Sequence, residues 1–125
     1  ASVEIEGAFS PESGHEAALQ ILAMKPRPTA AFFFNDEMAA GALHTLHEHA
    51  AVRIPQDISV IGFDDIAWTS FTHPPLTTVH VEMEWLGREA VDRLYRAVHD
   101  PGHVPTTTVT PTRVVVRKST GAPPP

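Results

Sequence analysis

A chain of 125 residues is long enough for one domain with a buried core. Its formal net charge of -6, with nine Lys and Arg, argues against a surface that grips nucleic acid, because such a surface must be basic. The absence of cysteine excludes disulfides and thiolate metal sites. No apolar run approaches the roughly 18–20 residues that cross a bilayer. Hydrophobic content of 42% fits a packed, soluble protein.

The chain is predicted to begin with a short strand and a helix. Residues 3–6 alternate apolar and acidic side chains, which is typical of a strand. Ser10 is a good N-cap residue and Pro11 suits the first helical position. Pro26 and Pro28 should end this helix, since proline interrupts helical hydrogen bonding. Its apolar face comprises Ala17, Ala18, Ile21 and Leu22.

The middle of the chain alternates strands with a second helix. Residues 30–34 form a continuous apolar run, as expected of a strand covered on both faces. Residues 58–63 predict a second doubly buried strand, and residues 77–81 a third. Asp36 is expected to cap the intervening helix. The apolar stripe of that helix is Ala39, Ala42, Leu43, Leu46 and Ala50.

The last third of the chain should contain the longest helix, over residues 82–99, followed by an extended segment. Residues 106–118 are rich in Thr and Val, and Pro111 should force a bulge, an edge position or a break there. Strands alternating with helices predict an α/β fold with a parallel sheet. The apolar face of the long helix is Leu86, Ala90, Val91, Leu94 and Val98.

Three ordered motifs point to one known family. They are the segment Phe34-Asn35-Asp36-Glu37-Met38-Ala39-Ala40-Gly41-Ala42, the segment Asp57-Ile58-Ser59-Val60-Ile61-Gly62-Phe63-Asp64-Asp65 and the segment Pro74-Pro75-Leu76-Thr77-Thr78-Val79. Together they resemble the lactose-repressor/galactose-repressor (LacI/GalR) family of bacterial transcription regulators. The resemblance implies a type I periplasmic-binding-protein-like fold, in which two lobes clasp a small effector in a cleft.

The resemblance covers only the C-terminal part of such a regulator, so the expected fold is a truncated three-layer lobe. Residues 1–81 would form an incomplete C-terminal lobe, and residues 82–105 a helix that belongs to the first lobe. Residues 106–118 would return toward the second lobe, and residues 119–125 would form a disordered tail. A helix-turn-helix pattern is missing from the sequence.

Three residues just past the predicted strand ends suggest a ligand site, because ligands of open α/β sheets bind at the carboxyl ends of strands. Phe9, Asn35 and Asp64 would supply an aromatic platform, an amide and a carboxylate, which suit a polyhydroxylated ligand. Simpler interpretations remain open for each. Asn35 could cap a helix, Asp64 could bond a turn, and Phe9 could pack.

The resemblance assigns the same three residues to the effector. In the family, the positions that match Asn35 and Asp64 commonly contact it, and an aromatic residue matching Phe9 often lines the cleft. This chain departs from the pattern at Val81 and Met83, where relatives often carry polar or aromatic contacts. The effector could therefore be less hydroxylated than a sugar.

Neither a catalytic nor a metal site is expected. Asp64 and Asp65 are consecutive on a presumed extended backbone, so their carboxylates should diverge and cannot share a proton as a catalytic dyad does. His44, His47, Glu48 and His49 are interpreted as a solvated helix face, since zinc sites normally assemble three or four ligands. No cofactor is implied.

The sequence thus predicts the effector-sensing and dimerising part of a cytoplasmic transcription regulator that is not an enzyme. The partners would be a sugar-like small molecule, a second copy of the chain and, only through a missing N-terminal domain, operator DNA. The resemblance places the dimer contact on Ala40, His44, Trp68 and Phe71. A solute-binding protein of a sugar importer is the alternative, and an enzyme ranks third.

Overall fold

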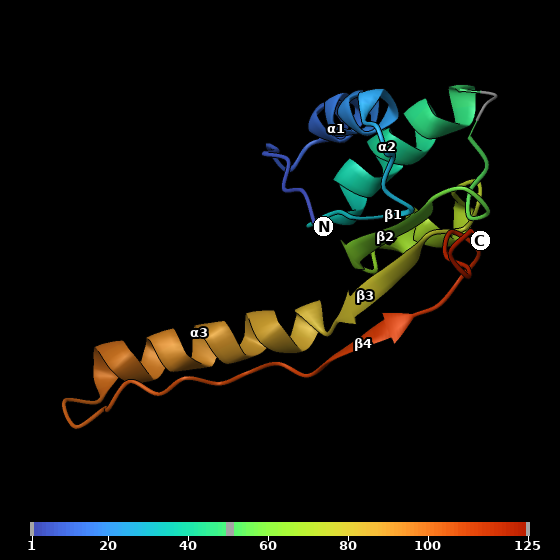
Figure 1. Ribbon diagram of the computed structural model, residues 1–125. Coiled ribbons are helices and arrows are strands. Elements are labelled where there is room, and N and C mark those ends of the chain that lie inside the picture. Colours follow the sequence, from blue (N-terminus) through green and yellow to red (C-terminus); the bar gives the residue numbers. More distant parts are fainter. Residues whose placement is uncertain (1, 50–51, 125) are drawn as a thin grey trace.

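A computed structural model describes residues 2–49 and 52–124, and shows a four-stranded sheet with helices (Figure 1). In chain order, the elements are α1 (Pro11–Ala23), β1 (Ala30–Phe32), α2 (Asp36–Glu48), β2 (Ser59–Asp64), a 3-10 helix η1 (Ala67–Phe71), β3 (Thr77–Val81), α3 (Met83–His99) and β4 (Thr112–Val115). Each predicted helix is present, and β3 has the predicted bounds.

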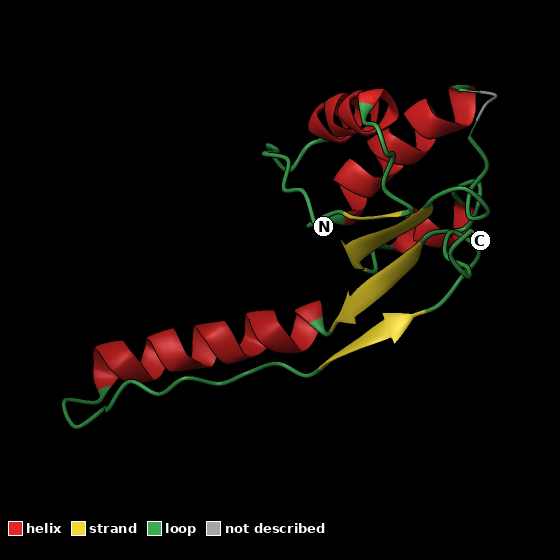
Figure 2. Cartoon of the chain, in the orientation of Figure 1, coloured by secondary structure: helices red, strands yellow, loops and turns green. Residues whose placement is uncertain are grey.

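The sheet has the order β1-β2-β3-β4, and the first three strands are parallel as predicted. Strand β4 runs antiparallel beside β3 at the edge, and it begins directly after Pro111. A proline at that point is compatible with an edge strand, because it has no N–H to donate. The fold is therefore α/β, with helices α1 and α2 on one face of the sheet (Figures 1 and 2).

The core lies between these two helices and the sheet. Ser10 caps α1 as predicted, since its side chain accepts a hydrogen bond from the Ser13 N–H at 3.3 Å. Two glycines let the helices cross closely: a Cβ on Gly14 would lie 1.9 Å from the Met38 carbonyl oxygen, and one on Gly41 1.9 Å from that of Pro11. The predicted stripes meet there, with the buried residues Ala17, Ala18, Ile21, Ala39, Ala42, Leu43 and Leu46. Ala50 lies outside the described residues.

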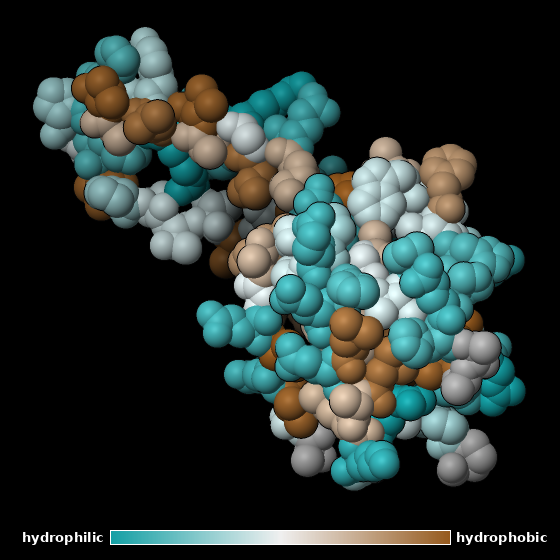
Figure 3. Space-filling view, turned by 90° about the horizontal axis from the view of Figure 1, so that it is seen from above, coloured by the Kyte–Doolittle hydropathy of each residue, from teal (hydrophilic) through white to brown (hydrophobic). Residues whose placement is uncertain are grey.

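Helix α3 projects away from this core as an arm (Figure 1). The extended residues 104–111 run beside it, and Arg93 ties them to the helix by donating to the Thr106 carbonyl oxygen at 2.6 Å (Figure 2). No α3 residue is buried, so its apolar face remains open to solvent. Brown side chains along the arm in Figure 3 show this face, which includes Leu86, Val91, Leu94 and Val98.

Three segments differ from the prediction. Residues 3–6 form no strand. The run 30–34 is covered on one face only: Phe33 is buried against the core, while Phe32 and Phe34 point away from it and are 49% and 66% exposed. The expected disordered tail is wrong at Ser119, which is fully buried. Its hydroxyl donates to the Val60 carbonyl oxygen at 2.6 Å and accepts from the Thr77 N–H.

Candidate functional site

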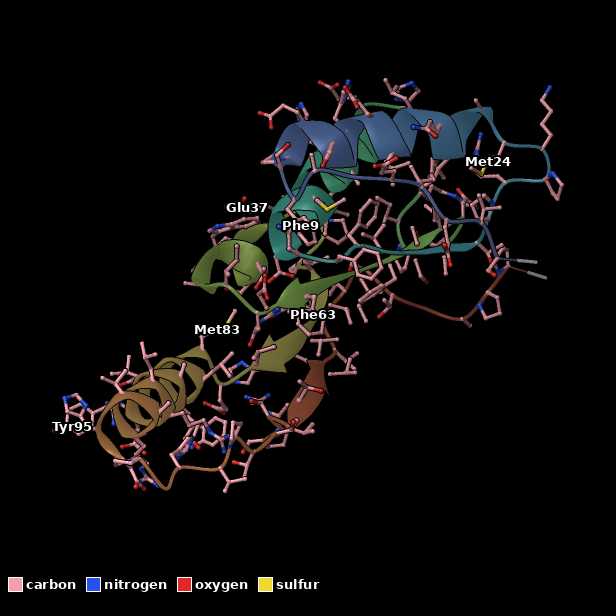
Figure 4. The ribbon with its side chains drawn as sticks, turned by 90° about the vertical axis from the view of Figure 1, so that its left-hand side faces the viewer. Phe9, Met24, Glu37, Phe63, Met83 and Tyr95 are labelled. Carbon is pink, nitrogen blue, oxygen red and sulfur yellow. The ribbon has the colours of Figure 1, made fainter. Side chains whose placement is uncertain are left out.

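The predicted ligand residues gather at the carboxyl ends of the parallel strands. Figure 4 views the molecule from the side to which β2 and β3 point. Phe9 and Glu37 lie there near the amino end of α2, and Met83 lies below them at the start of α3. Asp64 ends β2 at the same edge. The expectation that loop residues converge at this edge is therefore met.

Asn35 joins two of these segments. Its Oδ1 accepts a hydrogen bond from the Met38 N–H at 2.8 Å, so Asn35 caps α2. Its Nδ2 donates to the Phe9 carbonyl oxygen at 3.1 Å. Phe9 has a positive φ of 54°, which is uncommon for a bulky residue, and its side chain is 63% exposed. The cap interpretation of Asn35 is thus confirmed, and the same amide presents the exposed Phe9 ring at the site.

Asp64 has an acidic, partly buried environment. Burial raises the pKa of its carboxyl, and the negative charges of Asp36 and Glu37 add to that rise. Its φ of 109° is a strained value for a residue with a side chain. The extended backbone assumed at residues 64–65 is therefore wrong. Both oxygens of Asp65 are engaged, one by Arg117 and the other by His80.

Asp36 is a buried anchor rather than the predicted cap. Its carboxylate is inaccessible to solvent, and it accepts from the Thr78 hydroxyl at 2.6 Å and from the Ile66 N–H at 3.0 Å. Burial raises its pKa, although these hydrogen bonds oppose the rise. Gly62 leaves the space for it, since a Cβ there would lie 2.2 Å from Asp36 Oδ1. Asp36 therefore fixes the loop that follows Asp64.

Asp65 forms the centre of a second polar cluster. Its Oδ1 accepts from Arg117 Nη2 at 2.6 Å, and its Oδ2 lies 2.8 Å from Nδ1 of His80. Arg117 also donates to the Thr69 hydroxyl at 3.0 Å and to the Leu76 carbonyl oxygen at 2.8 Å. Burial alone would raise the pKa of Asp65, but the hydrogen bonds and charges of Arg117 and His80 outweigh it and lower that pKa. This cluster joins β2, η1, β3 and the end of the chain.

The predicted dimer residues lie on adjoining elements. Trp68 and Phe71 belong to η1 and are 40% and 86% exposed. Ala40 and His44 belong to α2, and the His44 side chain is exposed. The rings of His47 and His73 meet edge to face with centroids 5.6 Å apart, which joins α2 to the segment after η1. This contact places the end of α2 beside the segment that follows η1.

The histidine-rich end of α2 is a solvated face, as the sequence indicated. His44 lies 3.5 Å from Glu48, and both side chains are more than 60% exposed. Within residues 2–49 and 52–124, no group of three potential ligands is arranged to hold a metal ion.

A cavity of about 1260 Å³ lies elsewhere, between residues 2–6 and β1, with Ala17 and Ile21 among its lining residues.

Sequence reasoning missed Arg117, His80 and the burial of Asp36. Arg117 carries a weak signal, because it is a basic residue directly after the apolar run Val114-Val115-Val116. Gly62 inside a strand pattern is a second signal, since such a glycine often marks a close approach. Neither signal identifies the partner, because the contacts join residues up to 52 positions apart.

Comparison with protein families gives a match over residues 2–120 to the periplasmic binding protein-like domain. A curated relative, the HTH-type transcriptional repressor PurR of Photobacterium profundum, is 46% identical over 115 residues, covering 92% of this chain and 34% of the relative. The chain thus spans about one third of the length of this relative.

Solved structures agree with this match. The lac repressor dimer bound to operator and the anti-inducer ONPF superposes with a TM-score of 0.82 at 37% identity, covering 94% of this chain and 40% of that chain. The complex of the transcriptional regulator CelR with cellobiose gives a TM-score of 0.83 at 30% identity, with 94% and 37% coverage. The chain therefore belongs to the periplasmic binding protein-like domain family, in the form that LacI-type transcription regulators carry.

Proposed function

We propose that this chain is the C-terminal part of an effector-binding region, and that Asp64 receives the effector. The observation that carries this proposal is a contrast among three neighbouring carboxylates. Asp36 and Asp65 each accept hydrogen bonds through both oxygens. Asp64 is partly buried, and burial and nearby charges, without any hydrogen bond from the described residues, account for its raised pKa. An acceptor in that position is free to take a ligand donor.

The surroundings of Asp64 disfavour an anionic ligand and favour one with hydroxyl or N–H donors. Glu37 and Asp64 are both acidic, so an anionic ligand would be repelled. Phe9 offers an exposed ring that can stack on the C–H face of a sugar or on a flat heterocycle. The cellobiose complex of CelR supports the sugar-like choice by similarity.

Thermal unfolding with a panel of neutral sugars, including cellobiose, and of nucleobases tests the ligand class. We expect one class to raise the Tm of the complete gene product in a concentration-dependent way, because a ligand that binds only the folded state stabilises it. The Asp64→Ala variant should lose that increase. The control Glu16→Ala removes an exposed carboxylate from the surface of α1 and should retain it. An identical increase in wild type and Asp64→Ala would refute the role of Asp64.

We also propose that two copies meet through η1 and α2. Trp68 and Phe71 would supply buried aromatic contacts, which often dominate interface energies, and a two-fold axis would place the same surface on both partners. Sedimentation equilibrium should show weaker association for Phe71→Ser, whose side chain is 86% exposed. The control Val3→Ser, at a 66% exposed position outside η1, α2 and the arm, should associate like wild type. Equal association of all three proteins would exclude this surface.

The arm is a second contact surface in this proposal. Residues 82–105 would cover the first lobe of the complete protein, as the family resemblance implies. The isolated chain would then bury the apolar face of α3 against a neighbouring copy, since a stripe of this kind is unfavourable in water. The double variant Leu94→Ser/Val98→Ser should reduce self-association of the isolated chain. A strict monomer at high concentration would argue against both surfaces.

Operator binding would belong to a part of the protein other than this acidic chain. PurR and the lac repressor are transcription repressors and CelR is a transcriptional regulator, which favours a cytoplasmic regulator over a solute-binding protein and over an enzyme. No helix among the described residues combines the length and apolar character that a membrane crossing requires.

Electrophoretic mobility shifts should show no sequence-dependent DNA binding by this chain, because its formal charge is -6. Salt-sensitive, sequence-dependent binding would overturn this assignment.

A further inference from the structure

His80 lies between two carboxylates at the junction of the sheet and the arm. Its Nδ1 is 2.8 Å from Asp65 Oδ2, and its Nε2 is 3.1 Å from Glu82 Oε1. Asp65 follows β2, whereas Glu82 is the single residue between β3 and α3. The imidazole therefore connects the body of the sheet to the first residue of the arm.

Only one protonation state of His80 satisfies both contacts. A neutral imidazole has one N–H donor and one acceptor, while the imidazolium ion donates through both nitrogens. A carboxylate can only accept, so a neutral His80 would set a nitrogen lone pair against one of the two carboxylates. The imidazolium ion would donate to Asp65 and Glu82 together at these distances.

The two carboxylates differ in what holds them when the ring loses a proton. Asp65 is only 14% exposed, and Arg117 bonds its other oxygen. Glu82 is 61% exposed and can be solvated by water at little cost. The neutral ring is therefore expected to keep its Nδ1–H on Asp65 and to release Glu82.

The other groups near His80 do not substitute for this link. In the sheet, Asp64 of β2 and Arg113 of β4 are the register partners of His80. The Asp64 carboxylate is negatively charged like that of Glu82, so it also favours the protonated imidazole ring. Arg113 is exposed and forms no ion pair within the described residues. The groups that face His80 are thus mostly negative. They are Asp64 of β2, Asp65 and Glu82, and the two positive groups are Arg113 of β4 and Arg117, which engages Asp65.

We propose that His80 is a proton-dependent clamp that ties Glu82, and with it the first turn of α3, to Asp65 of the sheet. The clamp closes when the ring is protonated and opens at Glu82 as pH rises through the titration of the ring. In the two-lobed arrangement of the relatives, this would make the direction of the arm respond to pH independently of any effector.

Nuclear magnetic resonance of the 125-residue chain tests the clamp between about pH 5 and pH 8, where histidine side chains titrate. The probes are the His80 ring, the Glu82 side-chain carboxyl carbon and the backbone amide of Trp85 in the first turn of α3. We expect the three signals to shift with a common midpoint. The pH-dependent shifts (steps) of the Glu82 carboxyl carbon and the Trp85 amide should disappear in His80→Gln, because the glutamine side chain cannot be protonated.

A second variant covers the case in which His80→Gln fails to fold. Glu82→Gln changes an exposed residue, so the fold should persist. The His80 ring signal should still change with pH in this variant, while the pH-dependent shift of the Trp85 amide is lost. His44→Gln is the control, because His44 pairs with Glu48 on the surface of α2 and should leave all three steps unchanged. The clamp is refuted if the Glu82 carboxyl shows no step at the His80 midpoint, or if the Trp85 step survives in Glu82→Gln.

Discussion

Replacing Gly62 with alanine should destabilise the protein through the buried Asp36. The added Cβ would lie 2.2 Å from Asp36 Oδ1, the oxygen that accepts from the Thr78 hydroxyl at 2.6 Å. Asp36 would have to move, and its hydrogen bonds to Thr78 and Ile66 would be strained or lost. Overpacking costs about 1–3 kcal/mol and an unsatisfied buried group about 1–3 kcal/mol, so we expect a loss of roughly 2–4 kcal/mol in the free energy of unfolding.

Urea denaturation measures this loss, and Gly87→Ala is the matched control. A Cβ on Gly87 meets nothing within 4 Å, and alanine is favoured over glycine inside a helix by about 1 kcal/mol, so this variant should be as stable as wild type or more so. The cost of Gly62→Ala should shrink in an Asp36→Ala background, where the carboxylate is gone. A Gly62→Ala protein within about 0.5 kcal/mol of wild type would show that Asp36 does not require this space.

Three further predictions concern the charged groups. Arg117→Gln should lower the free energy of unfolding by roughly 1.5–3 kcal/mol in urea, because it removes a charged donor of Asp65. A loss below about 0.5 kcal/mol, the scatter of surface substitutions, would contradict the role of Arg117 in the cluster. The chemical shift of the Asp57 carboxyl carbon should titrate with a midpoint of about pH 2, since hydrogen bonds from Arg53 lower the pKa of Asp57. Arg53→Gln should return this midpoint part of the way toward 3.8, and an unchanged midpoint would refute the Arg53–Asp57 ion pair. Burial raises the pKa of Asp36, so the stability that this shift contributes is fully present below pH 3.8 and is lost as pH rises through the folded-state pKa. The urea midpoint of wild type should therefore fall over that pH range, whereas the midpoint of Asp36→Asn should lack this decrease. Urea midpoints that change with pH in the same way in both proteins would be contrary evidence.

Local patterns in the sequence predicted the elements that local physics determines. The apolar periodicity of α1 and α2, the Ser10 cap and the bounds of β3 all follow from side chains within a few residues of one another. The strand expected at residues 3–6 failed, because alternation alone supplies no partner strand. The burial of Ser119 also escaped prediction, since its partners Val60 and Thr77 are distant in sequence.

The candidate site was predictable in place but not in detail. The strand-end rule located Asn35 and Asp64 at one edge of the sheet, although the strand expected before Phe9 is absent. It could not show that Asn35 is committed to capping α2 and holding Phe9, nor that Asp65 is engaged by His80 of β3 and by Arg117. These roles depend on side-chain partners that only the folded chain brings together.

Isothermal titration calorimetry of the complete gene product with its ligand from the thermal panel tests the central claim most directly. Hydrogen bonds to a charged acceptor contribute roughly 1.5–3 kcal/mol, so Asp64→Ala should weaken binding at least about tenfold. The Tm of the unliganded variant should barely change, because no described residue bonds the Asp64 carboxylate. Affinity equal to that of wild type in a folded Asp64→Ala protein would contradict the assignment of Asp64 as the effector acceptor.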